Sequence, residues 1–331
     1  MDKIIKMDAN ENPIKHKINI GEIVQGINPR LYPDVTCSKI INKIASFYNI
    51  SSSEVVCTNG SDMLIKIITS SLVKPGNTII MPNIAFPTYE IAAKLYRYSY
   101  YLSPLKNYGI DLDDIIQNID ETTSLIWISN PHNPTGTLLP YREIIDFLNK
   151  VPSHINVVLD EAYAEYVDGM LLESLDLRKK YPNLIIIRTL SKAYGLAGAR
   201  IGYGIAETNI INKIKEFIGP FDLNSYAQEL GVQVIGEQDY VNDVREYTKN
   251  EMNKIENHCK KCKIEYIKSY ANFIMIKTKD NPDKLEKILF DRGLKIKNGK
   301  YIGLPGWIRV SINKSYYNDI LIKTLVNNQI E

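Results

Sequence analysis

The feature that most constrains the fold is an alternation of short apolar or β-branched runs with helix-like segments. Such an alternation is typical of α/β layers built around a mainly parallel sheet. The runs occupy residues 55–58 (VVCT), 78–81 (TIIM), 98–102 (YSYYL), 124–128 (SLIWI), 156–160 (NVVLD), 184–188 (LIIIR) and 200–205 (RIGYGI). The chain up to about residue 220 therefore predicts a large α/β domain.

The pattern changes beyond residue 220. Long charged helices are expected first, followed by strand-like runs at 271–277 (ANFIMIK) and 307–312 (WIRVSI). This order predicts a second, smaller α+β domain, although no Pro/Gly/Ser-rich linker separates it from the first. The expected organisation is an N-terminal arm over residues 1–25, a large domain over 26–220 and a small C-terminal domain over 221–331.

The composition is that of an ordinary globular protein, with 44% hydrophobic and 24% charged residues among 331. The net charge of +2 gives no electrostatic signature for binding nucleic acid or an anionic membrane. The N-terminal "MDKIIKMDANENP" lacks the apolar core of a signal peptide, and no apolar run approaches the roughly 18 residues of a membrane helix. The predicted location is the cytoplasm, with no nucleic-acid or membrane partner.

Two of the four cysteines have a CxxC spacing that is known from metal sites. Cys259 and Cys262 form a CxxC pair beside His258, but Cys37 and Cys57 stand alone far upstream. No second pair therefore lies at zinc spacing. The surrounding residues indicate a charged helix, on which two cysteines three apart share a face. We predict neither a metal site nor redox chemistry there.

Polar residues follow three of the expected strands at the point where each strand ends. Asn130 and Asn133 follow one strand, Asp160 closes the next, and Ser191 with Lys192 follows a third. Ligands of parallel α/β sheets bind outside the carboxyl ends of the strands. These side chains are therefore expected to converge on one crevice.

Two of these positions have alternative interpretations. Lys192, directly after a buried strand, is either a solvated surface cation or an amine held in a pocket for chemistry. The segment "NPHNPTG" at 130–136 could be a plain rigid turn. Asp160 is harder to explain structurally, because a carboxylate at the end of an apolar strand is costly to bury without a partner for its charge.

A phosphate-binding element is predicted in "TNGSDML". A glycine turn at Gly60 leads into a helix whose first N–H groups, at Ser61 and Asp62, would bind an anion. With Lys192, Asp160 and Arg200, these residues meet the needs of pyridoxal phosphate. That cofactor requires an amine for a Schiff base, an acid beside its ring nitrogen and anchors for its phosphate.

Motifs in this order resemble the fold-type I pyridoxal-phosphate aminotransferases, and among them the histidinol-phosphate aminotransferases. They run from about residue 8 to residue 312 and comprise "DANENP", "LYPD", "NPHNPTG", "DEAYAEY", "RTLSKAYGLAGARIGYG", "ANF" and "GLPGWIRVSI". The resemblance implies a mainly parallel seven-stranded sheet flanked by helices, with a smaller α+β domain. It also implies a pyridoxal 5'-phosphate-dependent enzyme.

The resemblance implies roles for residues around the cofactor ring. Lys192 would bind the cofactor covalently and then move a proton during the reaction. Asp160 would pair with the protonated ring nitrogen. Tyr163 and Asn133 would bond the ring 3-oxygen, and Tyr89 would stack on the ring face.

The resemblance assigns the cofactor phosphate to a second group of residues. Ser61, Asp62, Ser191 and Arg200 would hold it within one subunit. Tyr32, in "LYPD", would reach it from the neighbouring subunit. The resemblance therefore implies a homodimer with shared active sites.

The substrate side departs from the family pattern. Arg309 would bind the anionic group of the substrate, a bidentate task that suits guanidinium. The family usually has a tyrosine where Asn12 stands, and a second arginine where this chain has Lys297. We predict a small phosphorylated ketone as the amino acceptor, such as imidazole-acetol phosphate or dihydroxyacetone phosphate, with glutamate as the default donor.

Two other functions are compatible with parts of this pattern. A pyridoxal-phosphate decarboxylase acting on a phosphorylated amino acid such as threonine phosphate would use the same scaffold. A cofactor-binding transcription regulator would need an added DNA-binding domain, and "MDANENP" begins too close to residue 1 to leave room for one. The aminotransferase is the favoured prediction.

Overall fold

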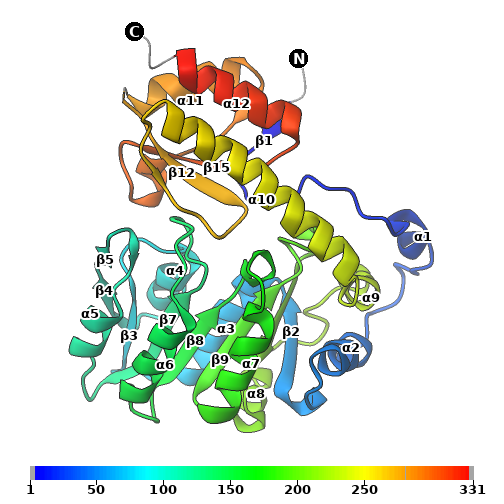
Figure 1. The fold of residues 1–331 in the computed structure, drawn as a ribbon. Helices are drawn as coiled ribbons and strands as arrows, with labels where there is room; N and C mark the ends of the chain where they lie inside the picture. The colour runs from blue at the N-terminus through cyan, green and yellow to red at the C-terminus, as the bar shows by residue number, and fades with distance from the viewer. Residues whose placement is uncertain (1–3, 280, 328–331) are drawn as a thin grey trace.

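The computed structural model of the chain describes residues 4–279 and 281–327. Its centre is a seven-stranded sheet (Figure 1). The spatial order is β2 (Val55–Asn59), β10 (Ile201–Ile205), β9 (Leu184–Thr189), β8 (Asn156–Asp160), β7 (Thr123–Ser129), β3 (Thr78–Pro82) and β4 (Ser99–Ser103). Strand β10 is antiparallel to both neighbours, and the other pairs are parallel. Every predicted run of the first part of the chain is a strand of this sheet, so the predicted fold class is confirmed.

Helices cover both faces of the large sheet because both faces of its strands are apolar. On β8, Val157 and Leu159 belong to one core cluster and Val158 to the other. The first face carries α2 (Ser38–Tyr48), α5 (Leu112–Gln117), α6 (Tyr141–Lys150), α7 (Met170–Lys180) and α9 (Ser225–Val234). The opposite face carries α3 (Ser61–Leu72), α4 (Thr88–Leu95) and α8 (Thr208–Lys215).

A second, antiparallel sheet lies above the large one (Figure 1). Its order is β11 (Tyr266–Ile267), β12 (Phe273–Lys277), β15 (Trp307–Ser311) and β14 (Lys297–Asn298). Apolar residues of α10 (Gln238–Lys261), α11 (Pro282–Asp291) and α12 (Ser315–Asn327) share its core. The two strand-like runs expected in this part of the chain are β12 and β15.

The N-terminal segment is attached to the small sheet. Strand β1 (Ile5–Lys6) pairs in parallel with β13 (Leu294–Lys295), and the fully buried Met7 joins the small core cluster. The N–H of Ser311 on β15 donates to the carbonyl of Met7 at 2.8 Å. The start of the chain and its last strands are therefore one packing unit, although they lie at opposite ends of the sequence.

Helix α10 connects the two sheets and crosses between them (Figure 1). Its Val244 packs in the core of the large sheet, whereas Met252 and Ile255 pack in the core of the small one. Leu230 of the preceding α9 also belongs to the large core. Both helices lie beyond residue 220 and contact the core of the large sheet, so their packing does not mark a boundary at that residue. The expected domain division stays a prediction.

The CxxC pair lies at the end of α10, as the sequence indicated. Cys259 is fully buried in the small core, and the Nε2 of His258 lies 3.5 Å from the Sγ of Cys262. Among residues 4–279 and 281–327, no cluster of three or more His, Cys, Asp or Glu is arranged to bind a metal ion. Within the same described ranges, no helix has the length and apolar character needed to cross a membrane.

Candidate active site

A cleft of about 400 Å³ lies between the ends of the large-sheet strands and the small sheet. Most of the predicted site residues line it. They are Ser61, Asp62, Tyr89, Asn133, Asp160, Tyr163, Ser191, Lys192, Arg200, Lys297 and Arg309.

Sheet topology explains why the cofactor-side residues meet. Strands β7, β8 and β9 are parallel neighbours, and the pairing places Ser129 beside Asp160 and Asp160 beside Ile187. Residues that follow these strands therefore emerge at one edge of the sheet, where α/β proteins bind ligands. The segments that carry Asn133, Asp160 and Lys192 reach the cleft in this way.

Asp160 is the buried acid of the site, with 5% of its surface exposed. Its Oδ1 accepts the N–H of Ala162 at 3.1 Å, and its Oδ2 accepts the hydroxyl of Tyr89 at 2.5 Å. Burial raises the pKa of this carboxyl to about 6, against the lowering effect of the two hydrogen bonds. A protonated ring nitrogen of a ligand would supply the positive partner that this carboxylate otherwise lacks.

Tyr89 is held by two contacts on its own side of the cleft. The side chain is fully buried, and its ring stacks on Trp127 with centroids 4.8 Å apart and planes 11° apart. Its hydroxyl is bonded to Asp160, so Tyr89 acts on the acid as well as lining the cleft. Stacking of Tyr89 on a cofactor ring stays a prediction.

Lys192 is a half-buried amine directed into the cleft. Its Nζ donates to the carbonyl of Ala9 at 3.2 Å and lies 5.7 Å from the ring centroid of Tyr163. No carboxylate of the described residues forms an ion pair with it. This geometry favours the pocket amine over the solvated surface cation, because a neutral carbonyl leaves the amine available for a ligand.

The predicted phosphate-binding element lies at the start of α3. Gly60 occupies the N-cap with a φ of 80° and offers no side chain to cap the first amides of the helix. Arg200 reaches the same place, where its Nη2 contacts the Oδ2 of Asp62 at 2.8 Å and its Nη1 donates to the Oγ of Ser191 at 3.4 Å. Uncapped helix amides beside a guanidinium are the arrangement that favours an anion, so binding of a phosphate here stays a prediction.

Close backbone packing maintains this site. A Cβ at Gly60 would lie 2.5 Å from the Nη2 of Arg200, and a Cβ at Gly202 would lie 2.2 Å from the amide nitrogen of Ser61. Side chains at either position would therefore displace the guanidinium or the helix start. The residues present fit the phosphate of pyridoxal phosphate, as the lysine and the buried acid fit its aldehyde and its ring nitrogen.

Tyr163 lies at the centre of a hydrogen-bonded group. Its hydroxyl oxygen accepts the Nδ2 of Asn10 at 2.9 Å and the Nδ2 of Asn133 at 3.4 Å. The Oδ1 of Asn133 in turn accepts the Nη1 of Arg309 at 2.7 Å. The structure therefore joins two residues expected at the cofactor ring to the residue expected at the substrate.

Arg309 and Lys297, the two residues expected at the substrate, line the cleft from the small sheet. They are directly opposite each other on β15 and β14, so both side chains leave the same face of the small sheet. Arg309 is 7% exposed, and its Nη2 donates to the backbone carbonyl of Asp8 at 2.8 Å, while its buried Nε has no hydrogen-bond partner. Burial lowers the pKa of this guanidinium.

Two predicted residues do not line the cleft. Asn12 donates its Nδ2 to the carbonyl of Ala193 at 2.8 Å and to the hydroxyl of Tyr240 at 3.1 Å, which directs its amide away from the cleft. Tyr32 is 81% exposed and stacks on Phe221 at 4.4 Å. Their predicted contacts, with the substrate and with a partner subunit's cofactor, stay predictions.

Other residues line the cleft that were not singled out from the sequence. Asp8, Ala9 and Asn10 come from the N-terminal segment, and Tyr301 with Ile302 comes from the turn before β15. The motif "DANENP" already marked the first three as part of an ordered pattern. Nothing in the sequence showed which of its side chains would point into the cleft.

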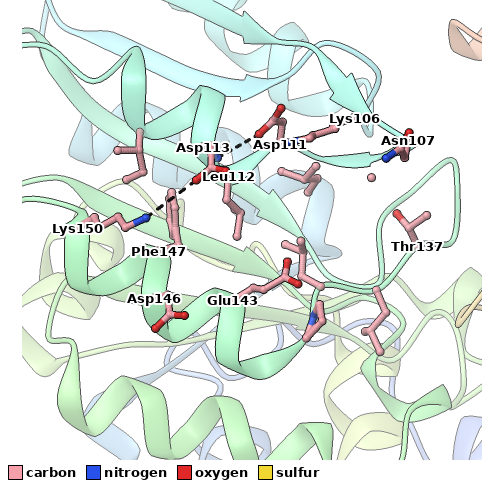
Figure 2. A pocket seen from close by; sticks show the side chains of 16 residues that line it. Lys106, Asn107, Asp111, Leu112, Asp113, Thr137, Glu143, Asp146, Phe147 and Lys150 are labelled. Atoms are coloured by element: carbon pink, nitrogen blue, oxygen red, sulfur yellow. Dashed lines mark hydrogen bonds and ion pairs between the residues drawn. The ribbon is translucent and has the colours of Figure 1, made fainter.

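A second cavity, of about 620 Å³, lies between α5, α6 and the hairpin of β5 (Leu105–Lys106) and β6 (Gly109–Ile110) (Figure 2). Carboxylates dominate its charged lining: Asp111, Asp113, Glu143 and Asp146 accompany Lys106 and Lys150. It contains none of the predicted site residues. Converging polar groups, and not cavity size, therefore identify the candidate active site.

Comparison with known proteins agrees with this site. Residues 3–325 match the family model for aminotransferase class I and II. A histidinol-phosphate aminotransferase from Caldicellulosiruptor saccharolyticus is 35% identical over 98% of this chain and 92% of its own length. A histidinol-phosphate aminotransferase from Bacillus licheniformis is 34% identical over 98% of this chain and 91% of its own.

Solved structures give the same result for the fold. The histidinol-phosphate aminotransferase from Clostridium acetobutylicum superposes with a TM-score of 0.89 at 25% identity, covering 99% of both chains. The enzyme of that name from Sinorhizobium meliloti, solved in complex with pyridoxal-5'-phosphate, superposes with a TM-score of 0.91 at 22% identity over 99% of this chain and 91% of its own. The chain therefore belongs to the class I and II aminotransferases, resembles the histidinol-phosphate aminotransferases among them, and is a pyridoxal-phosphate-dependent enzyme.

Proposed function

We propose that this aminotransferase moves an amino group, with glutamate as donor, to a small phosphorylated ketone such as imidazole-acetol phosphate or dihydroxyacetone phosphate. One observation carries the proposal. Arg309 and Lys297 lie side by side on the cleft face of the small sheet, and neither forms an ion pair within the described part of the chain. Two neighbouring cations without a counter-ion are costly to keep half-buried or buried, and a phosphate group would offset that cost.

The cofactor side of the cleft has residues for each part of the bound group. When bound, pyridoxal phosphate supplies a conjugated ring that draws electrons from the reacting carbon. Asp160 would hold the proton on the ring nitrogen as a buried carboxylate. Tyr163 and Asn133 would donate hydrogen bonds to the ring oxygen.

Lys192 would carry the proton transfers of the reaction. Its Nζ lies inside the cleft, and the hydrogen bond to the carbonyl of Ala9 leaves two of its three N–H groups and, after deprotonation, a lone pair for chemistry. As a free amine it would remove the proton from the carbon that bears the substrate's amino group, and then return it at the acceptor position. The surrounding small sheet would exclude water from this step.

Arg309 and Lys297 would select the substrate by its phosphate. Arginine offers a planar fork with several donors, whereas lysine offers a point charge on a flexible chain. Because both candidate ketones share a phosphorylated hydroxyketone end, one pair of cations could bind either.

A homodimer is part of the proposal. Tyr32 is 81% exposed and belongs to an exposed apolar group with Leu31 at 66% and Val35 at 55%, as expected of a surface that contacts another subunit. Tyr32 of the partner subunit would complete the phosphate site, so we expect light scattering to show a dimer. An active monomer at assay concentrations would contradict this part of the proposal. The cytoplasmic location stays a prediction.

The test of the substrate is a comparison of kcat/KM for each ketone with and without its phosphate. In the wild type, removal of the phosphate should lower kcat/KM by more than about tenfold, or about 1.4 kcal/mol. In Arg309→Ala that preference should shrink, because the main phosphate contact is gone. A smaller effect of the phosphate in the wild type would make an amino-acid carboxylate the better candidate for this cleft.

A half-reaction screen identifies the donor and tests the decarboxylase alternative. The enzyme is first converted to its amine form, and carbonyl compounds are then tested for their ability to restore the absorbance of the aldehyde form. The same preparation is assayed for carbon dioxide released from threonine phosphate. Release of carbon dioxide without formation of a keto product would replace the proposed reaction with decarboxylation.

A further inference from the structure

Three consecutive residues near the N-terminus each contact a different residue of the active site. The carbonyl of Asp8 accepts from Arg309 at 2.8 Å, and the carbonyl of Ala9 accepts from Lys192 at 3.2 Å. The side chain of Asn10 donates to Tyr163 at 2.9 Å. We call residues 8–10 the strap. Its first two members use backbone atoms, whereas Asn10 uses its side chain, so its role depends on residue identity.

Asn10 is fixed in one orientation by the small sheet. Its backbone N–H donates to the Oγ of Ser311 at 2.8 Å, and the same hydroxyl donates to the Oδ1 of Asn10 at 2.9 Å. The Nδ2 of Asn272 donates to the carbonyl of Asn10 at 3.0 Å. Asn10 is 2% exposed. With Oδ1 occupied by Ser311, the Nδ2 is the end of the amide that faces Tyr163.

The backbone conformation also favours this residue type. Asn10 has a φ of 56°, in the left-handed region that asparagine and aspartate tolerate better than most residues. In this conformation the side-chain amide of Asn10 reaches Tyr163. Glycine would tolerate the same backbone but would provide no amide.

The hydrogen bonds that the Tyr163 oxygen accepts determine where its hydroxyl proton can point. A phenolic hydroxyl has one proton to donate and two lone pairs that accept. Two amide groups, from Asn10 and Asn133, already donate to the oxygen of Tyr163. The hydroxyl proton is therefore directed away from both amides and is free for an acceptor in the cleft.

We propose that Asn10 is a positioning residue that makes the Tyr163 hydroxyl a hydrogen-bond donor to the cofactor. The proposal rests on the function proposed above, in which Tyr163 bonds the ring oxygen. Asn10 does not touch substrate or cofactor in this scheme. It acts through Tyr163, and it couples the small sheet and the N-terminal strap to the large-sheet side of the cleft.

The test is Asn10→Asp, a change that keeps the size and the left-handed backbone of the residue but replaces the donating amide with an acceptor. The carboxylate would accept the proton of Tyr163 and turn it away from the cofactor. A hydrogen-bond donor at the ring oxygen stabilises the negative charge on that oxygen. Loss of this donor therefore raises the pKa of the proton whose release changes the visible absorption of the bound cofactor. In Asn10→Asp the pH midpoint of the bound cofactor's visible absorption should rise by about one unit, a tenfold change in the proton equilibrium.

A double mutant separates positioning from simple stability. In the Tyr163→Phe background the neutral variant Asn10→Gly, which adds no charge to the cleft, should change the midpoint by less than about 0.3 unit, because the hydroxyl that Asn10 acts through is gone. Equal shifts in both backgrounds would overturn the proposal. If Tyr163→Phe alone leaves the midpoint unchanged, the proposed role of Tyr163 fails instead.

Two further variants complete the experiment. Asn272→Ala removes the bond to the carbonyl of Asn10 and should lower the thermal midpoint without moving the absorption midpoint. If it moves the absorption midpoint as far as Asn10→Asp does, the effect is structural and the proposal is wrong. If Asn10→Asp does not fold, Asn10→Gly keeps the positive φ accessible and should give a midpoint shift of the same sign, and no shift in that variant contradicts the proposal.

Discussion

The two sides of the cleft are built differently. The cofactor side comes from segments that follow β2, β3, β7, β8 and β9 of one sheet, and Asp160 is itself the last residue of β8. The substrate side comes from β14, β15 and the N-terminal strap, which reach the cleft through the packing of a second sheet. The large sheet by itself determines where the cofactor-side residues lie. The positions of the substrate-side residues depend on how the two sheets pack against each other.

Polar and aromatic contacts join the two sides, and the ring of Tyr163 packs edge-on against Phe273 of the small sheet with centroids 5.2 Å apart. Arg309 reaches Asn133 at 2.7 Å, and Asn10 reaches Tyr163 at 2.9 Å. Each is a side-chain hydrogen bond, worth much less than the pairing of neighbouring strands. Changes on the cofactor side should therefore abolish chemistry for every substrate, whereas changes on the substrate side should alter the choice between substrates.

The largest effect is expected at Lys192. Lys192→Ala should lose the visible absorption band that borohydride abolishes in the wild type, because no amine remains to bond the cofactor. Turnover should fall by at least about 10⁴-fold, since the group that moves the proton is gone. Lys192→Arg is the matched control, because it keeps the charge and should still lose the band. A reducible band that persists in Lys192→Ala would contradict the assignment of the cofactor side.

Asp160→Asn should have the second largest effect. The protein should fold and bind cofactor, but an amide cannot hold the ring-nitrogen proton by charge. We expect turnover to fall at least about a hundredfold, roughly 3 kcal/mol of transition-state stabilisation, for all substrates alike. Asp113→Asn, at a carboxylate that is 71% exposed in the second cavity, is the control and should leave turnover unchanged. Near-normal turnover in Asp160→Asn would show that another residue supports the ring nitrogen.

A pH dependence of cofactor affinity should follow from the same residue. The pKa of Asp160 is about 6 in the cofactor-free protein, so the carboxyl is neutral below that pH and ionised above it. Because the bound cofactor favours the carboxylate, affinity should rise with pH through 6 and level off above it, by at most about tenfold per pH unit. Fluorescence titration of the cofactor-free protein measures this. Asp160→Asn should lack the dependence, and a flat profile in the wild type would contradict it.

The smallest expected effect is at Lys297. Lys297→Ala should lower kcat/KM for the phosphorylated ketone by about fivefold, close to 1 kcal/mol, because a half-buried point charge is partly screened by water. The unphosphorylated ketone should be unaffected. Lys277→Ala is the control, since Lys277 pairs with Glu265 at 2.6 Å on the same sheet. If Lys297→Ala reduces kcat/KM equally for both ketones, Lys297 does not bind the phosphate.

Asp160 and Lys192, which the sequence placed at strand ends, both line the cleft, and there is a physical reason why their positions could be predicted. A buried parallel strand has a readable apolar run, and the residue after it must emerge at the ligand-binding edge. The apolar runs and the residues that follow them therefore predicted the positions of Asp160 and Lys192 without knowledge of distant contacts. The same patterns did not show that the hydroxyl of Tyr89 bonds Asp160, because that contact joins β8 to a helix 71 residues earlier.

Asn12 shows where sequence patterns were insufficient. Asn10 and Asn12 are two residues apart in one motif, yet Asn10 faces Tyr163 while Asn12 faces Ala193 and Tyr240. The left-handed backbone at Asn10 and its hydrogen bond with the hydroxyl of Ser311 direct the Asn10 side chain toward Tyr163. Neither is visible in the local sequence, and Ser311 lies 301 residues away.

The sequence alone determined the α/β class, the strands of the large sheet and the positions of Lys192, Asp160 and Ser61 at its edge, because periodicity and strand ends are local properties. Only the tertiary structure decided that Arg309 and Lys297 share a face, that the strap of residues 8–10 touches three site residues, and that Tyr163 is held by two amides. These features arise where the two sheets and the start of the chain pack together. Contacts between such distant segments depend on the whole fold, and no short stretch of sequence specifies them.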